Sequence, residues 1–489
     1  MKTKTILVSA LFLLFSFKSA SANFFKNITN LIENNYESLR YGISVADVNK
    51  DGAYEFIVAG FGSENLALSY KNKKLKNIIE DEIFSDKKSF TIGVAACDID
   101  SDGYEEIYFL NTDTYSGEKK FSDRLVDLKN KKFFDVFEQK KNQKDLNFTA
   151  GRSVVCVDRK GNGKFGIYVA NYGGPTRFYE KFKGKIIDKA VELGLDKITG
   201  GRAVVAGHIL SNNIDIFAAN ERGVNFLYKN VDGTFYDMAS SFNILDSYEN
   251  GRGTTLSDVL YRGQLDIVSG NWDGEHRIFV KKENTFKDIA DGKFKIPSKI
   301  RTVISADFDN DGYDEIFLNN IGEPNKLFKI RENGKLEEID ISLNSEAKGL
   351  GTGAAVADID RDGVLELLIA HGETGNQKLT LYKANVKKEK NYIRIKALNK
   401  NGAPARGATV TLISNLREHS KTIDAGSGYL CQMEPVAHYG IRDGEKNFKI
   451  SIKWTNGKTN NYKINEIGKT YIFKENKMSV KSNATITIK

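Results

Sequence analysis

The chain has 489 residues, of which 40% are hydrophobic and 11% aromatic, and this composition supports a substantial core and argues against global disorder. The formal charge of +8 comes from lysines spread along the chain, which indicates a solvated surface and no nucleic-acid-binding patch. The length accommodates two or three domains, or a repeat array with an appended domain.

Residues 1–22 read as a secretory signal peptide. Lys2 and Lys4 precede an apolar stretch, 6–17, and Ala20-Ser21-Ala22 supplies the small residues of a cleavage site near Ala22. The apolar stretch is too short to cross a bilayer, and no later segment reaches 18 apolar residues, so no membrane span is expected. The sequence therefore predicts a mature protein outside the cytoplasm, either periplasmic or secreted.

Four acidic loops of one design begin at Asp47, Asp98, Asp307 and Asp358. Each has oxygen-bearing side chains at positions 1, 3 and 5, Gly at position 6 and Glu at position 9, which suits Ca²⁺. With position 7 contributing its carbonyl, the predicted ligands are Asp47, Asn49, Asp51, Ala53 and Glu55; Asp98, Asp100, Asp102, Tyr104 and Glu106; Asp307, Asp309, Asp311, Tyr313 and Glu315; and Asp358, Asp360, Asp362, Val364 and Glu366. An EF-hand is excluded because its last ligand is at position 12. The alternative is a solvated acidic turn.

Three weaker copies lie between the second and third loops, starting at Asp158, His208 and Asp258. The seven starting points are separated by 51, 60, 50, 50, 49 and 51 residues, and a constant period near fifty indicates repeated supersecondary units. The middle copies have lost most ligands: Lys160 is a candidate to replace the cation, and His208 is an isolated histidine.

Each repeat reads as four short strands, so the predicted fold is all-β, with a seven-bladed β-propeller over 23–386. The aromatic pattern of the outer strands recurs at 24–29, before the first repeat. We therefore expect this segment to supply the outer strand of the seventh blade, the alternative being a frayed terminus.

The period stops near residue 387. Strand patterns at 391–397, 408–413, 448–454 and 470–473 predict a separate small β domain over 387–476, followed by a polar tail at 477–489.

The chain has three cysteines, an odd number that cannot be fully paired. Cys97 lies one residue before a loop and Cys156 two residues before the equivalent position, so on strands they point to opposite faces. The sequence predicts no bridge between them.

The repeats resemble FG-GAP/VCBS repeats, and the stretch 426–441 with Trp454 and Gly457 resembles the ASPIC/UnbV domain. The pairing of the two is similar to the cartilage acidic protein family. The resemblance implies an extracytoplasmic Ca²⁺-binding propeller and says little about its ligand.

Arginines recur six residues before the loop position, and asparagines recur five residues after the last loop position. In a propeller both sets lie at the mouth of the channel opposite the loops, where they suit a carboxylate, sulfate or phosphate. The candidate ligand-binding residues are Arg152, Arg202, Arg252, Arg301, Asn171, Asn220, Asn271 and Asn320. The alternatives are pairing of the arginines with acidic residues such as Glu221, and asparagines acting as turn residues.

No catalytic triad or zinc spacing stands out. The favoured hypothesis is a binding or adhesion module for an anionic small molecule, a glycan or a cell-surface protein, with Ca²⁺ as a structural cofactor. The alternative is an enzyme working at the channel mouth or at Gln432, Glu434 and His438 in the C-terminal motif, a cluster that also fits a hydrogen-bonded turn.

Overall fold

A computed structural model describes residues 23–386, 390–476 and 481–482. The expected signal peptide at 1–22 and most of the expected polar tail at 477–489 lie outside the described residues. No helix in the described residues is long and apolar enough to cross a membrane.

Seven four-stranded antiparallel units form the larger part of the described chain. Blades 1 to 3 are β2 (Arg40–Ala46) to β5 (Lys74–Asn77), β6 (Thr91–Cys97) to β9 (Lys132–Asp135), and β10 (Gly151–Val157) to β13 (Lys185–Asp188). Blades 4 to 6 are β14 (Ile198–Gly207) to β17 (Thr234–Asp237), β18 (Gly251–Ser257) to β21 (Thr285–Asp288), and β22 (Ile300–Ala306) to β25 (Leu336–Ile339). Blade 7 contains β26 (Gly351–Ala357), β27 (Glu366–His371), β28 (Thr380–Ala384) and β1 (Phe25–Asn27).

The second and third strands of blades 1 to 6 lie between these bounds. They are β3 (Glu55–Gly60), β4 (Leu66–Lys71), β7 (Glu106–Asn111), β8 (Arg124–Lys129), β11 (Gly166–Pro175), β12 (Arg177–Phe182), β15 (Asp215–Asn220), β16 (Phe226–Val231), β19 (Asp266–Asn271), β20 (Arg277–Lys282), β23 (Glu315–Asn320) and β24 (Lys326–Ile330). The short helical segments are α1 (Glu82–Ser85), α2 (Ala190–Leu193), and the 3₁₀ turns η1 (Thr29–Leu31), η2 (Gln143–Asp145) and η3 (Ser342–Asn344).

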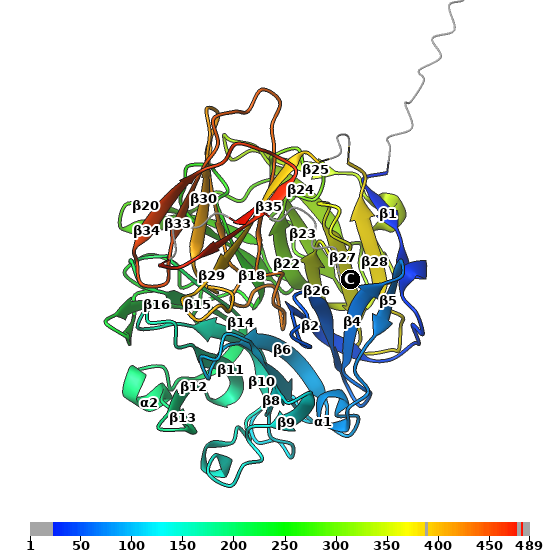
Figure 1. Cartoon of the computed structure of the whole chain (residues 1–489), viewed down its shortest axis with the longest axis vertical. Coiled ribbons are helices and arrows are strands. Elements are labelled where there is room, and N and C mark those ends of the chain that lie inside the picture. Colours follow the sequence, from blue (N-terminus) through cyan, green and yellow to red (C-terminus); the bar gives the residue numbers. More distant parts are fainter. Residues whose placement is uncertain (1–22, 387–389, 477–480, 483–489) are drawn as a thin grey trace, which may run out of the picture.

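The first strand of each blade packs against the first strand of the next, and β26 packs against β2, so the ring is closed. These inner strands are almost entirely buried because each lies between two neighbouring blades. In Figure 1 the colours run around the ring from blue through cyan and green to yellow, which returns beside the blue β1. The predicted all-β propeller fold is confirmed, and its strands group into seven units in the described residues.

Closure uses the N-terminal segment. Strand β1 pairs antiparallel with β28, with Phe25 opposite Ala384 and Asn27 opposite Tyr382. Phe25 is buried and meets the rings of Phe308 and Phe317 in blade 6. The expectation that 24–29 supplies the missing outer strand is therefore confirmed.

The second domain is a pair of four-stranded sheets around its own core. One sheet has the order β32 (Ala437–Gly440), β29 (Tyr392–Leu398), β35 (Lys469–Lys474) and β36 (Lys481–Ser482), with β29 and β35 parallel. The other has the order β31 (Glu418–Thr422), β30 (Thr409–Ile413), β33 (Lys449–Lys453) and β34 (Thr459–Lys463). Trp454 is fully buried between them, and Figure 1 shows these orange and red strands lying over the ring.

Residues 424–436 of this domain, the channel segment, enter the centre of the ring. Backbone hydrogen bonds join them to the inner strands of five blades: Cys156 N to Ala425 O, Gly428 N to Thr254 O, Val94 N to Leu430 O, Gln432 N to Ile43 O, and Glu434 N to Val356 O. The stretch recognised in the sequence as ASPIC/UnbV-like therefore fills the propeller channel, which the sequence did not predict.

Cys97 and Cys156 form a disulfide, with their Cα atoms 5.8 Å apart. The prediction of no bridge is wrong. It compared strand faces as if both cysteines belonged to one sheet, but they lie on β6 and β10, the inner strands of neighbouring blades, whose facing sides meet at the blade interface. Cys431 is free and buried in the channel segment.

Candidate functional site

The four acidic loops share one hydrogen-bonding pattern. In each, one oxygen of the position-1 Asp accepts from the backbone N–H of the position-6 Gly, at 2.8, 3.3, 2.9 and 3.1 Å in chain order. One oxygen of the position-9 Glu accepts from the N–H of position 2, at 2.8 to 3.2 Å. The position-5 Asp accepts from the N–H of position 7, so Ala53, Tyr104, Tyr313 and Val364 hold the turn.

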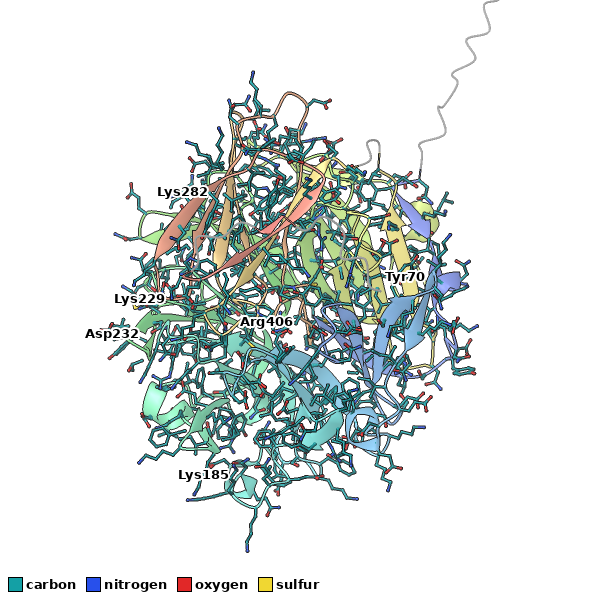
Figure 2. All side chains as sticks on the ribbon, in the orientation of Figure 1. Tyr70, Lys185, Lys229, Asp232, Lys282 and Arg406 are labelled. Atoms are coloured by element: carbon teal, nitrogen blue, oxygen red, sulfur yellow. A yellow bond between two sulfur atoms is a disulfide. The ribbon has the colours of Figure 1, made fainter. Side chains whose placement is uncertain are left out.

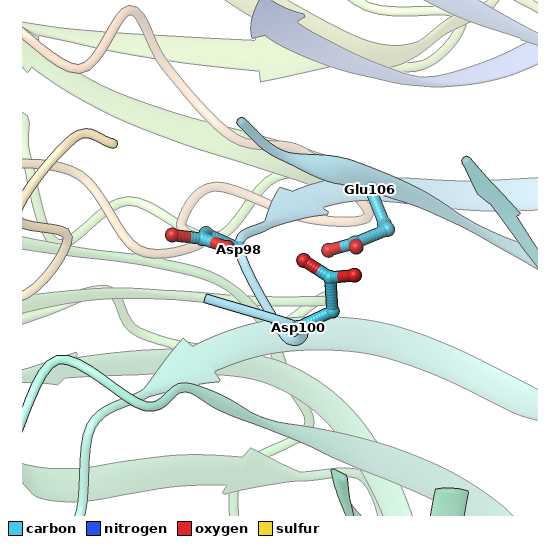
Figure 3. Close-up of side chains that lie close together, drawn as sticks. All are labelled: Asp98, Asp100 and Glu106. Carbon is cyan, nitrogen blue, oxygen red and sulfur yellow. The ribbon is translucent and has the colours of Figure 1, made fainter. Parts of the chain in front are cut away.

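In several of these side chains the second carboxylate oxygen accepts no hydrogen bond. Asp98 Oδ1, Asp307 Oδ1, Asp358 Oδ1 and Glu55 Oε1 are buried and have no hydrogen-bond partner. Carboxylate oxygens come within 4.8 Å of one another in three groups: Asp98, Asp100 and Glu106 (Figure 3); Asp307, Asp309 and Asp311; and Asp358, Asp360 and Glu366. Three loops therefore bring predicted ligands together into groups that fit a hard cation.

The first loop differs, as its Asn49 suggested. The loop keeps the same backbone hydrogen bonds, but the side chain of Asn49 donates to Asp51 at 2.9 Å. Among the described residues, the carboxylates of this loop do not form a converging group like those of the other three loops. This loop offers a cation fewer converging charges.

Burial and mutual repulsion raise the pKa values of the clustered carboxyl groups. The pKa of Asp98 rises to about 7, mainly because the group is buried and also because Asp102 and Asp100 are close. The pKa of Asp307 rises to about 8 for the same reasons, and that of Glu106 rises well above its usual value. A cation at the centre would stabilise the ionised form of each group.

Lysines from the third strand of the same blade reach two of these loops. Lys329 Nζ lies 3.0 Å from Asp309, 2.6 Å from Asp311 and 2.9 Å from Glu315. Lys383 Nζ lies 2.8, 2.8 and 2.5 Å from Asp360, Asp362 and Glu366. Both lysines stand opposite the position-9 Glu in the strand register, a signal that the sequence reading missed.

Within the described residues, the three middle loops bring no acidic cluster together. Asp158 accepts from Gly163 N and Thr455 Oγ1, while His208 shares a hydrogen bond with Thr409 Oγ1. In blade 5, Arg262 pairs with Asp266, which stands at position 9, at 2.7 Å. A guanidinium thus takes the place of a cation there. The substitute-cation role of Lys160 stays a prediction.

The second domain covers the loop face of the propeller. Arg406, only 1% exposed, is bonded to both oxygens of Glu105 in the second loop and to Val45 O. Arg417 and Arg442 both donate to Gly312 O in the loop of blade 6. Figure 2 places Arg406 near the centre of the molecule, whereas Lys185 and Lys282 lie at its outer edge.

At the opposite mouth, the structure brings the four predicted arginines together, all of them buried. Arg202 and Arg252 pair with Glu221, Arg301 pairs with Glu373, and Arg152 donates to Tyr115 O and Gly151 O. Arg202 lies 4.5 Å from the ring centre of Tyr172, and Arg301 lies 4.1 Å from that of Trp272. We call these four residues and their partners the arginine mouth.

Tyr429 of the channel segment reaches the arginine mouth from inside, and its hydroxyl accepts from Arg202 at 3.3 Å. Burial alone would raise the pKa of Tyr429, but the four guanidiniums lower it below its usual value. Neither Tyr429 nor Glu373 was predicted. No local pattern links them to the arginines, because the contacts depend on how the second domain and the seventh blade are placed.

The predicted asparagines are buried in the second strands: Asn220, Asn271 and Asn320 are the last residues of β15, β19 and β23, and Asn171 lies within β11. Asn171, Asn220, Asn271 and Asn320 each donate through Nδ2 to the carbonyl four residues later, at 2.6 to 2.7 Å. This geometry corresponds to the turn alternative, and their role in ligand binding stays a prediction.

Two protein families match parts of the chain. The FG-GAP-like repeat family matches residues 258–318 and 307–369, and the ASPIC and UnbV family matches residues 398–480. Among solved structures, YCF48 bound to a D1 peptide has a TM-score of 0.45 at 8% identity, covering 74% of this chain and 97% of that chain. BBS1N in complex with ARL6DN has a TM-score of 0.46 at 10% identity, covering 72% and 97%.

The fold and its loops define an FG-GAP-repeat β-propeller carrying an ASPIC and UnbV domain. Cartilage acidic protein 1 of Xenopus tropicalis is 43% identical over 465 residues, covering 87% of this chain and 72% of that protein. The human protein of the same name is 42% identical over 478 residues, covering 89% and 72%. The chain belongs to the cartilage acidic protein 1 family.

Proposed function

We propose that this protein is an exported, calcium-stabilised propeller that binds an anionic ligand at its arginine mouth. The ligand is a carboxylate- or sulfate-bearing small molecule, glycan or cell-surface protein. The observation that carries the proposal is a charge imbalance: four buried guanidiniums face two carboxylates, and Arg252 Nε, Arg301 Nε and Arg301 Nη1 have no hydrogen-bond partner. Buried donors of this kind favour an incoming oxyanion.

Glu373 is the accessible part of this arrangement. Its side chain is 32% exposed, whereas that of its partner Arg301 is 5% exposed. A ligand carboxylate or sulfate would therefore compete with Glu373 for Arg301, and the ring of Trp272 beneath the guanidinium would hold it in place.

The test uses an array of sulfated and sialylated glycans, probed with and without calcium. Arg301→Gln should weaken retention, because it removes the donors, and Glu373→Gln should strengthen it, because it removes the internal competitor. Glu323→Gln is the matched control: it removes the same charge from the neighbouring blade, where Glu323 pairs with Lys299 instead. If Glu373→Gln and Glu323→Gln behave alike, only net charge matters and the arginine mouth is not the site.

For calcium, the support is the set of converging buried oxygens in the loops of blades 2, 6 and 7, which would hold it through Asp98, Asp307, Asp358 and their partners. The ion would supply positive charge that ties two strands of a blade together. At a concentration about ten times Kd, one site stabilises the folded state by about 1.4 kcal/mol.

Chelation with EDTA should therefore lower the melting temperature, and Asp98→Asn should reduce the stabilisation that calcium gives. Asp258→Asn is the matched control, because no acidic cluster is found in the blade 5 loop among the residues that the structure describes. It should lower the baseline stability and leave the calcium increment unchanged. A melting temperature that does not respond to EDTA would refute the calcium proposal.

Export is supported by two observations. The N-terminal 22 residues have the pattern of a signal peptide, and a buried disulfide joins blades 2 and 3. Disulfides form and persist mainly in oxidising compartments outside the cytoplasm.

A further inference from the structure

A pocket of about 400 Å³ lies where the propeller loops of blades 1 and 7 meet the second domain. Gly52 and Tyr54 come from the loop of blade 1, and Asp358 and Arg361 come from the loop of blade 7. Arg394 and Lys396 come from β29 of the second domain. Tyr392, Gly468, Lys469 and Thr470 complete the wall on the side of the second domain. The pocket is on the opposite face of the propeller from the arginine mouth.

The lining carries an excess of positive charge. Arg361, Arg394, Lys396 and Lys469 are cationic, whereas Asp358 and Glu434 are the acidic groups of the lining. Both acidic groups are already engaged by Arg394, which lies 3.3 Å from Asp358 and 2.5 Å from Glu434. Glu434 also accepts from the backbone of Asp358. The other cations of the pocket therefore gain little from these carboxylates.

Lys396 is the least compensated of these cations. Its ammonium lies 4.2 Å from the ring centre of Tyr54, and it makes no ion pair with any carboxylate of the described residues. Burial lowers the pKa of Lys396 to about 8, an effect that Glu434 opposes only in part. An ammonium that is partly desolvated without a counter-charge is unfavourable unless an anion joins it.

We infer that this pocket binds a small oxyanion, a carboxylate or a phosphate, with Lys396 as its principal contact. Arg361 stands at the exposed edge, where its one hydrogen bond, 3.4 Å to Gly52 O, leaves most of the guanidinium free to meet the anion. Tyr54 and Tyr392 form aromatic walls beside the cations. Their faces suit a ligand that carries a flat or apolar body next to its charged group.

The test measures how fast each lysine is acylated by an amine-reactive reagent, using peptide mass spectrometry on the calcium-loaded full chain. Acetate, inorganic phosphate and sulfate are added in separate arms, which distinguishes a carboxylate site from a phosphate site. At ten times Kd about one tenth of the sites remain free, so acylation of Lys396 should slow about tenfold. Lys185, exposed at the propeller edge, should be acylated at an unchanged rate (Figure 2).

Two variants separate this pocket from the arginine mouth. Arg361→Met should remove the protection of Lys396, and Arg301→Gln should leave it intact. The assignment would be overturned if the anion protected Lys185 and Lys396 equally. It would also be overturned if the protection of Lys396 survived Arg361→Met and was lost in Arg301→Gln. Because the readout is the acylation of one lysine, its result does not depend on whether glycans bind at the arginine mouth.

Discussion

Replacing Gln432 by leucine tests whether the channel segment is locked into the propeller. The Gln432 side chain is fully buried. Its Oε1 accepts from Ser44 Oγ and from Ala96 N, both at 2.8 Å, and its Nε2 donates to Ala96 O at 3.1 Å and Ala425 O at 3.2 Å. Three of these hydrogen bonds join the channel segment to blades 1 and 2, and the fourth, to Ala425, holds the segment's own turn.

Leucine fills a similar volume and leaves no large cavity, so the cost comes from the polar groups that lose their partner. At about 1 kcal/mol for each hydrogen bond, the loss is about 4 kcal/mol. An unfolding entropy of about 2.1 cal/mol/K per residue amounts to about 1 kcal/mol/K for 489 residues, so the melting temperature should fall by about 4 °C.

Differential scanning calorimetry and urea denaturation measure this change. Gln143→Leu is the matched control, because Gln143 is exposed and the same substitution there should change stability by less than about 0.5 kcal/mol. If Gln432→Leu melts within about 1 °C of the wild type, the four bonds do not form in solution and the channel is not filled as described.

Two further predictions concern the propeller itself. His276 Nδ1 accepts from Asn271 N and burial lowers the pKa of His276 to about 4, so the unfolded state binds a proton first as the pH falls. The free energy of unfolding should therefore fall by about 1.4 kcal/mol per pH unit from about pH 6.5 down to about 4. In the flanking blades, Asn225 and Asn325 accept the equivalent backbone hydrogen bond, so His276→Asn should keep that bond and remove the slope. The measurement is the difference in unfolding free energy between wild type and variant, plotted against pH. The Cys97–Cys156 bridge closes a loop with a sequence separation of 59, so Cys97→Ser with Cys156→Ser should cost about 4 kcal/mol in urea denaturation. A reducing agent that leaves the wild-type midpoint unchanged would contradict the bridge.

The propeller ring could be predicted because the same sequence pattern recurs in every blade. Seven loop positions at a constant period predict seven blades, and the aromatic pattern at Phe24 and Phe25 predicts the strand that closes the ring. The carboxylates of the loops could be predicted for the same reason: side chains at alternate positions of one turn meet without help from distant residues.

The contacts between distant segments could not be read in this way. Tyr429 belongs to a Gly- and Ser-rich stretch without strand or helix periodicity, and nothing local indicates that it enters the channel. The disulfide was missed because blade-to-blade packing, and not the pleat of one strand, decides which face Cys97 shares with Cys156. Lys396 needed the second domain to be placed on the loop face before its surroundings were known.

The pairing of β1 with β28 also sets the order in which the molecule is completed. Residues 25–27 are among the first to follow the expected leader, yet their partners at 382–384 lie at the end of the last blade, and the channel segment comes later still. Until those residues arrive, both ends of the incomplete ring expose unpaired strand edges, which are prone to join other chains. Contacts between segments so far apart also form slowly. The final folding step must therefore wait until almost all of the chain is available, because only then are the strand edges of the first and last blades covered.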